Sequence, residues 1–331
     1  MAPVDEGQII TLSCEGATCK IAVHGAHVLS WKSASGRELL YMSELATFAE
    51  GKTALRGGIP ICWPAFAGKN PKIGKHGFVR TATDWEVVPV AGGKTEADKD
   101  ASLAQLKYTT TFNRCFVNGT DKTDVTAENK VTLLITFLLT KNTLGLHLAV
   151  ENAAPEPLPF SGCLHTYFAK DEAKTDVEVS GFKCFKSTRE LGKQWENEDD
   201  VVKVDGKQEV ERMFFVPKAE KDVADMQDSA AALDPKSLLE DKTTIQTHAN
   251  PCVMRFEPFS TPEVLTLYTS KSIPDSVVWN IGSSAPDKIP KDMAEKDELR
   301  YLCVEPGLVE QDAVVPAQGS WTGWHVMELS E

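Results

Sequence analysis

The feature of this sequence that most constrains its fold is a succession of short runs rich in Val, Ile, Thr, Phe and Tyr, separated by turn residues. Such runs are typical of β-strands. No stretch alternates a strand with an amphipathic helix of about 10–15 residues, which argues against Rossmann and TIM-barrel architectures. The pattern predicts an all-β fold, a large antiparallel sandwich with a few short helices. The runs are Gln8–Ser13, Cys19–Val23, Trp85–Val90, Gln105–Phe112, Val131–Thr140, Thr143–Asn152, Val264–Tyr268, Ser276–Trp279 and Thr322–Leu329.

The predicted strands extend over most of the chain, which bears on its division into domains. A length of 331 residues suggests about two domains, but large all-β folds often run this long as one unit. We therefore expect one domain over residues 1–331. Lys141 and Asn142, between two of the runs, are typical of a two-residue hairpin turn. The stretch 217–244 has apolar residues at helical spacing, and we interpret it as a surface insertion.

The charges of the chain are unevenly distributed. Lys and Arg number 35 against 48 Asp and Glu, a net charge of −13. That balance argues against nucleic acid or an anionic membrane as a partner, since both favour a basic protein face, and it also disfavours an anionic small substrate. Residues 51–83, however, hold six basic side chains and no acidic one, so 33 residues carry +6 and the other 298 carry −19. We call residues 51–83 the basic island.

The basic island has the chemistry of an anion-binding loop. It is rich in Gly and Pro, and glycine permits close approach of a backbone to a ligand. Arg56 and Arg80 each offer a bidentate fork matched to phosphate or carboxylate oxygens. The apolar segment 59–64, which includes Trp63, is typical of a pocket wall, and His76 is a candidate ligand contact. The alternative is a solvated basic loop that pairs with acidic neighbours.

Cysteine usage and the chain ends bear on the compartment and on cofactors. None of the eight cysteines shows C-x-x-C spacing, and several lie in apolar runs, so buried reduced thiols are the expectation. The N-terminus lacks the features of a secretory signal, and the longest apolar run, Val131–Leu139, is too short to span a bilayer. We therefore expect a soluble cytoplasmic protein. Motifs for nucleotides or for a catalytic metal are lacking, so we expect neither a cofactor nor a metal.

Two titratable residues stand in β-like segments with apolar neighbours. A period of two puts His165 on one face with Cys163 and Tyr167, and partial desolvation there tunes the pKa of a histidine. Glu305 ends an apolar run that a Pro-Gly pair is expected to terminate, where burial raises a carboxylate pKa toward the range of a general base. The alternatives are a structural core histidine and a solvated edge charge.

Short motifs rich in Gly, Pro, aromatic and titratable residues occur in order along the chain: 24–31 (HGAHVLSW), 55–60 (LRGGIP), 63–64 (WP), 76–80 (HGFVR), 164–168 (LHTYF), 277–280 (VVWN) and 303–307 (CVEPG). Each motif alone is weak, but their order and rough spacing agree over nearly the whole chain. The ordered set resembles the signature of the hexose-6-phosphate mutarotases (glucose-6-phosphate 1-epimerases) in the aldose 1-epimerase superfamily.

The resemblance implies a galactose mutarotase-like β-supersandwich without a cofactor. It implies that His165 and Glu305 form the catalytic pair, which opens and recloses the sugar ring by general acid–base catalysis. The expected enzyme is a monomeric, cytoplasmic isomerase of carbohydrate metabolism that interconverts the anomers of a hexose 6-phosphate, glucose 6-phosphate above all. The implied substrate contacts are Arg56, His76, Arg80, Glu211, which stands where relatives usually carry Asp, and Trp279.

Three other functions remain open at this point. A mutarotase of unphosphorylated aldoses would share the catalytic pair without needing Arg56 and Arg80. A non-catalytic carbohydrate-binding sandwich would keep the aromatic wall and the basic rim without requiring both His165 and Glu305. A structural or regulatory protein that reuses the fold would have no affinity for sugar phosphates.

Overall fold

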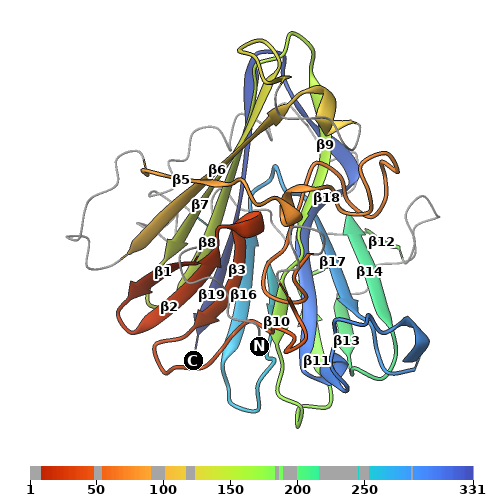
Figure 1. The fold of residues 1–331 in the computed structure, drawn as a ribbon. Coiled ribbons are helices and arrows are strands. Elements are labelled where there is room, and N and C mark those ends of the chain that lie inside the picture. The colour runs from red at the N-terminus through yellow and green to blue at the C-terminus, as the bar shows by residue number, and fades with distance from the viewer. Residues whose placement is uncertain are drawn as a thin grey trace.

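The computed structural model describes residues 9–47, 54–90, 101–116, 124–182, 186–188, 200–215, 245, 253–284 and 286–330. Antiparallel strands dominate it, as Figure 1 shows, and the all-β prediction is confirmed. The predicted insertion at 217–244 lies outside the described residues. In the described part of the chain, no helix is long and apolar enough to cross a membrane.

The strands are β1 (Ile9–Cys14), β2 (Ala17–Ala22), β3 (His27–Lys32), β4 (Ile61–Cys62), β5 (Glu86–Val88), β6 (Ser102–Thr111), β7 (Lys130–Leu139), β8 (Thr143–Asn152), β9 (Leu158–Leu164), β10 (Tyr167–Ala169), β11 (Val177–Ser180), β12 (Lys186–Thr188), β13 (Val201–Val204), β14 (Val210–Phe215), β15 (Met254–Phe256), β16 (Val264–Thr269), β17 (Asp275–Asn280), β18 (Tyr301–Val315) and β19 (Gly319–Ser330). The short 3-10 turns are η2 (His24–Ala26), η3 (Val79–Thr81), η4 (Asn113–Cys115), η7 (Pro286–Lys288) and η8 (Asp297–Leu299).

All nine strands that the sequence predicts are present, with ends displaced by a few residues. The hairpin at Lys141 and Asn142 is also present, because the Thr140 amide donates to the Thr143 carbonyl across it (2.9 Å). One strand end differs from the prediction. β18 does not stop at Pro306 but continues to Val315, because Gly307 is paired on both sides, with β17 and with β9.

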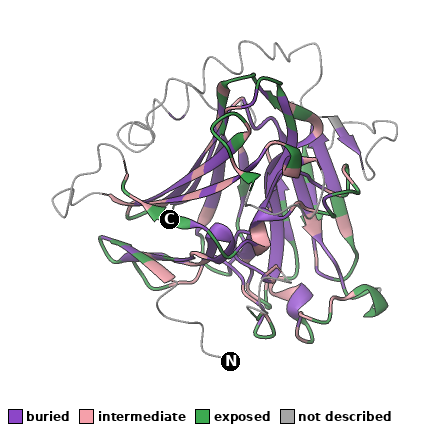
Figure 2. Cartoon of the chain, turned by 45° about the horizontal axis from the view of Figure 1, so that its top comes forward, coloured by how far each residue is buried: buried purple, intermediate pink, exposed green. Residues whose placement is uncertain are grey.

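The strands form two large sheets and one small one. The seven-stranded sheet has the order β12-β14-β17-β18-β9-β4, with β10 also paired to β18, and the nine-stranded sheet has the order β13-β11-β15-β16-β19-β8-β7-β6-β5. β1, β2 and β3 make the small sheet. Figure 2 shows that the central lengths of the strands are buried and that exposed residues gather in the connecting loops.

Aromatic side chains join the two large sheets across the core. Phe160 on β9 meets Trp321 on β19 with ring centroids 5.0 Å apart. Phe168 on β10 meets Phe256 on β15 at the same separation, 5.0 Å. Such pairs bury large apolar areas in preferred edge-to-face geometry. The seven-stranded sheet therefore has one face committed to the core.

The other face of the seven-stranded sheet is where polar side chains gather. Alternation along β18 sends Leu302 and Val304 into the main core, while Cys303 and Glu305 project from the opposite face. Segments of the basic island and of the loop that follows β17 cover that second face, as the residues of the cavity described below show. The second face of the seven-stranded sheet therefore carries side chains that come together from distant parts of the chain.

Candidate active site

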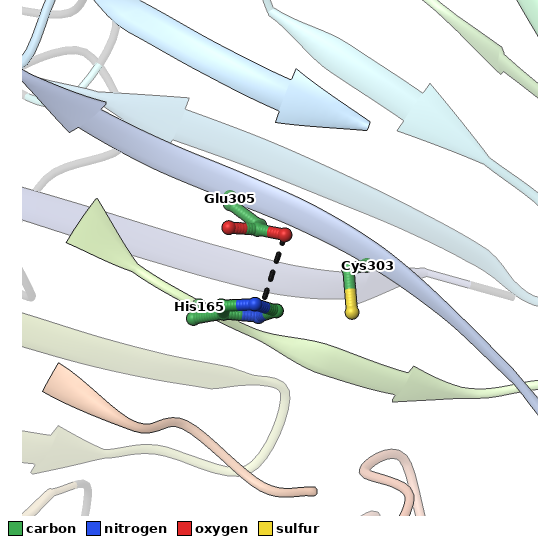
Figure 3. A group of neighbouring side chains, drawn as sticks. All are labelled: His165, Cys303 and Glu305. Atoms are coloured by element: carbon green, nitrogen blue, oxygen red, sulfur yellow. Dashed lines mark ion pairs between the residues drawn. The ribbon is translucent and has the colours of Figure 1, made fainter. Parts of the chain in front are cut away.

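His165, in the short break between β9 and β10, faces Glu305 on β18. Cys163 on β9 pairs with Gly307 on β18, and Tyr167 on β10 pairs with Cys303, so the register on both sides puts His165 opposite Glu305. Nδ1 of His165 lies 3.3 Å from Oε1 of Glu305 (Figure 3), a close contact that is not aligned as a hydrogen bond. Both side chains are largely buried, at 12% and 2% exposure. Because β9 and β10 are both paired with β18, the two side chains are held with little freedom to separate.

The pair stands at the wall of a cavity of about 380 Å³, within the size range of small-molecule sites. All seven residues that the sequence predicts for the site line this one cavity: Arg56, His76, Arg80, His165, Glu211, Trp279 and Glu305. β-Sheet register explains part of this convergence, because Glu211 on β14 is paired with Trp279 on β17, which is paired with Cys303 on β18. Their roles in binding or catalysis stay predictions.

Arg56 is held in place by partners from two other segments. Its Nε and Nη2 each lie 3.2 Å from Oδ1 of Asp292, and its Nη1 donates to the Tyr167 hydroxyl at 3.0 Å. The chain after it must turn close to its neighbours: Gly57 and Gly58 have φ of 117° and 61°, and a Cβ on Gly58 would lie 2.1 Å from the Val28 carbonyl oxygen. Glycine is therefore required beside Arg56.

Other cationic side chains of the basic island differ in whether they reach the cavity. Lys75 and Arg80 line the cavity, and in the part of the chain that the structure describes neither has a recorded ion pair; Nε of Arg80 is buried without a hydrogen-bond partner. Lys69, in contrast, lies outside the cavity and pairs with Asp312 at 2.9 Å. The interpretation as a solvated loop is thus right for Lys69. Arg80 thus offers its positive charge to a cavity that Glu211 and Glu305 also line.

His76, a residue of the basic island, lies beside His165. Its ring is edge-on to His165 with centroids 5.8 Å apart, and its Nδ1 accepts from the Ala67 amide at 3.5 Å. Burial, followed by the charges of Arg80, Lys75 and Arg56, lowers the pKa of His76 to about 3. The ring is therefore neutral, and the acceptor role of Nδ1 leaves Nε2–H as a hydrogen-bond donor.

Burial shifts the pKa values of Glu305 and His165 in opposite directions. It raises the pKa of Glu305 from an ordinary 4.5 to about 8, against a smaller opposing effect of the Cys163 hydrogen bond. It lowers the pKa of His165 well below 6.5, assisted by electrostatic interactions with His76, Arg56 and Arg80. Without substrate at neutral pH, the two side chains therefore share one titratable proton, and that proton rests on the Glu305 carboxyl.

Sequence reasoning missed several side chains at the site. Tyr167 stacks on His165, with centroids 4.8 Å apart and ring planes 5° from parallel, and it lines the cavity. Its place on the same face as His165 is the signal that could have identified it. Lys288 lines the mouth and pairs with Glu209 at 2.8 Å. Nothing local in the sequence marks Asp292, which reaches Arg56 across 236 positions.

His165, Cys303 and Glu305 also form a set of potential metal ligands, with ligand atoms all within 4.8 Å of one another (Figure 3). The surroundings do not fit a cation well. Burial and the Glu305 charge raise the pKa of the Cys303 thiol well above its ordinary value, so the thiolate that a metal needs is disfavoured. The charges of Arg56 and Arg80 lie on the same cavity. These positive charges disfavour a metal cation beside His165, Cys303 and Glu305.

The fold and the site together define a class of protein, the galactose mutarotase-like β-sandwiches. A galactose mutarotase-like protein from Lactobacillus casei has a TM-score of 0.63 at 15% identity, covering 97% of this chain and 100% of that one. A Salmonella typhimurium structure described as a "putative mutarotase (YeaD)" has a TM-score of 0.69 at 20% identity, covering 98% and 90% of the two chains. These likenesses show the fold.

Sequence comparison identifies the family. The Aldose 1-epimerase family model matches residues 8–328, and the chain belongs to this family. A Cenchrus ciliaris protein named "Putative glucose-6-phosphate 1-epimerase" is 23% identical over 325 residues, which are 96% of this chain and 82% of that protein. Family membership supports an aldose epimerase activity, the interconversion of α and β anomers.

Proposed function

We propose that the protein interconverts the α and β anomers of a hexose 6-phosphate, with glucose 6-phosphate as the preferred substrate. The observation that carries this proposal is the buried His165–Glu305 pair, 3.3 Å apart, on a cavity that Arg56, Lys75 and Arg80 also line. The name of the Cenchrus ciliaris relative supports the same substrate. The reaction needs no cofactor, because no electrons or groups are transferred.

Interconversion of the anomers requires one proton acceptor and one proton donor. A base removes the proton of the C1 hydroxyl while an acid protonates the ring oxygen, the C1–O5 bond breaks, and the aldehyde forms. Rotation about C1–C2 and the reverse proton transfers give the other anomer. Glu305 is the base and protonated His165 the acid, each contributing about 10²–10⁴-fold. When the two side chains share one titratable proton, one of them can donate a proton and the other can accept one.

A phosphorylated substrate places that proton where the reaction needs it. Two of the charges that hold down the pKa of His165, those of Arg56 and Arg80, lie on the cavity where the phosphate would bind. A phosphate dianion beside them compensates their charge and raises the pKa of His165. A higher pKa of His165 favours transfer of the proton from Glu305 to His165, which is the state with a carboxylate base and an imidazolium acid.

Arg80 is the residue that we expect to discriminate most strongly between a phosphorylated and an unphosphorylated sugar. A site with a desolvated cationic donor penalises a ligand that leaves it unpaired. Trp279 and Tyr167 line the same cavity and offer aromatic surface, and Glu211 and His76 offer polar groups to sugar hydroxyls.

The matched test compares Arg80→Ala with Lys69→Ala, which removes an equal charge from the same island outside the cavity. Arg80→Ala should lower kcat/KM for glucose 6-phosphate by about 10²-fold, the size of a lost charge-assisted hydrogen bond, with little effect on glucose. Lys69→Ala should change neither. Equal losses of Arg80→Ala on both sugars would contradict phosphate recognition.

A mutarotase of unphosphorylated aldoses is the second candidate. The Arg56–Asp292 contacts at 3.2 Å favour it, because they already compensate one of the cavity's positive charges. Preference of the wild-type protein for glucose over glucose 6-phosphate would select this function.

We also propose a single-domain, monomeric, cytoplasmic enzyme. Six cysteines in the described residues are buried and free of disulfides: Cys14, Cys19, Cys62, Cys115, Cys163 and Cys303. Buried thiols of this kind are typical of a reducing compartment.

A further inference from the structure

The Glu305 carboxylate has two oxygens with different neighbours. Oε1 faces Nδ1 of His165 at 3.3 Å, and Oε2 accepts a hydrogen bond from the Cys163 thiol at 3.4 Å. Within the described ranges these are the two recorded polar contacts of the carboxylate. The ring is on one side and the thiol on the other, so the two contacts together define how the carboxylate is turned.

Sheet register explains why Cys163 meets Glu305. Cys163 on β9 is paired with Gly307 on β18, and Glu305 lies two residues before Gly307, hence on the same face of the sheet. On its other side Cys163 is paired with Cys62 on β4. The side chain at position 163 therefore lies diagonally beside the carboxylate, within reach of one of its oxygens.

The remaining surroundings of Cys163 are apolar. It belongs to a buried cluster with Cys62, Phe66, Met213, Phe215, Val277 and Val309. A carboxylate at the edge of such a cluster gains no hydrogen bond from the hydrocarbon side chains. Burial, followed by the Glu305 charge, raises the pKa of the Cys163 thiol well above its ordinary value, so Cys163 stays a donor over the whole working range.

We propose that Cys163 is a positioning residue that orients the Glu305 carboxylate through its thiol and keeps Oε1 turned toward His165 and the sugar. The thiol is a weak donor, so it fixes direction while leaving the carboxylate more basic than a hydroxyl donor would. The catalytic meaning of this contact rests on the proposed function, but the contact itself can be tested without substrate.

The test is the titration of Glu305 in protein labelled with ¹³C at the glutamate side-chain carboxyl. The Glu305 resonance is identified by its absence in Glu305→Gln. Cys163→Ala removes the donor and should raise the pKa of Glu305 by about half a unit to one unit, whereas Cys163→Ser supplies a stronger donor and should lower it by a similar amount. Cys62→Ala is the matched control, since it removes a buried thiol from the same cluster without removing the hydrogen bond, and it should leave the titration in place.

The order of the pKa values, Ala above Cys above Ser at position 163, is the supporting result. Equal effects of Cys163→Ala and Cys62→Ala would show that packing alone is at work and would overturn the proposal. If Cys163→Ala fails to fold, Cys163→Ser against wild type decides: an unshifted titration contradicts the contact. In active enzyme the alkaline limb of kcat/KM should follow the same order. If wild type has no epimerase activity, the proposed function fails while the titration still decides on Cys163.

Discussion

Glu305→Gln should make the fold more stable while removing catalysis. The structure buries this carboxyl almost completely and raises its pKa from 4.5 to about 8. The unfolded chain releases the proton from about pH 4.5 upward, whereas the folded protein keeps it until about pH 8. Between these values the folded state binds more protons, so stability falls as pH rises. Glutamine does not titrate, so the stability of the Glu305→Gln variant does not fall in this way as pH rises.

The size of the effect follows from linkage. One pKa unit corresponds to 1.36 kcal/mol, so the burial of an ionisable carboxyl costs about 3 kcal/mol at pH 7 and about 1 kcal/mol at pH 5. The free energy of unfolding of Glu305→Gln relative to wild type should therefore rise by about 2 kcal/mol between pH 5 and pH 7. Differences between glutamine and a protonated glutamate in packing cancel in this comparison. His165 is neutral in both folded proteins over most of this range and cancels as well.

Urea unfolding at several pH values measures this difference, with tryptophan fluorescence and circular dichroism required to give the same midpoint. Glu209→Gln is the control, because Glu209 lies at the cavity mouth in an exposed pair with Lys288. Its effect should stay within about 0.5 kcal/mol at every pH. A gain for Glu305→Gln that is the same at pH 5 and pH 7 would refute the claim that this carboxyl is held protonated by burial.

The other predictions concern catalysis. His165→Asn should reduce anomer exchange of glucose 6-phosphate by at least about 10²-fold while calorimetry still shows binding, and full activity would remove His165 from the mechanism. The pH profile of kcat/KM should be bell-shaped: the alkaline limb near pH 8 marks loss of the shared proton from Glu305, and the acid limb below pH 6.5 marks a second proton on His165. A profile that is flat from pH 5 to pH 9 would contradict this proton count.

Much of the fold follows from runs of β-branched, aromatic and apolar residues separated by turn residues. The runs that became β7, β8 and β16 are recognisable because they are rich in Val, Ile, Leu and Thr, and the Lys141-Asn142 turn fixes one hairpin. In the structure these three strands are buried along most of their length. These patterns do not predict the register in which strands far apart in the sequence pair with one another. Extending β18 beyond Pro306 depends on pairing of Gly307 with two other strands, which no local signal specifies.

The sequence was enough to predict which residues line the cavity, but not which partners contact them. Ordered motifs shared with a family indicate that His165, Glu305 and Arg56 belong together, and all three line one cavity. The residues that orient these three side chains could not be predicted. Asp292 reaches Arg56 from the loop after β17, and Cys163 reaches Glu305 because two strands meet in one particular register. Such contacts depend on tertiary geometry that spacing along the chain does not encode.

Exchange spectroscopy on glucose 6-phosphate at anomeric equilibrium tests the central claim most directly. With wild-type protein, we expect exchange cross-peaks between the α and β anomeric protons at a rate well above that of buffer, and a much slower exchange with glucose. Glu305→Gln at the same concentration should return the rate to that of buffer. Wild-type exchange no faster than buffer would contradict the account, and so would undiminished exchange in Glu305→Gln.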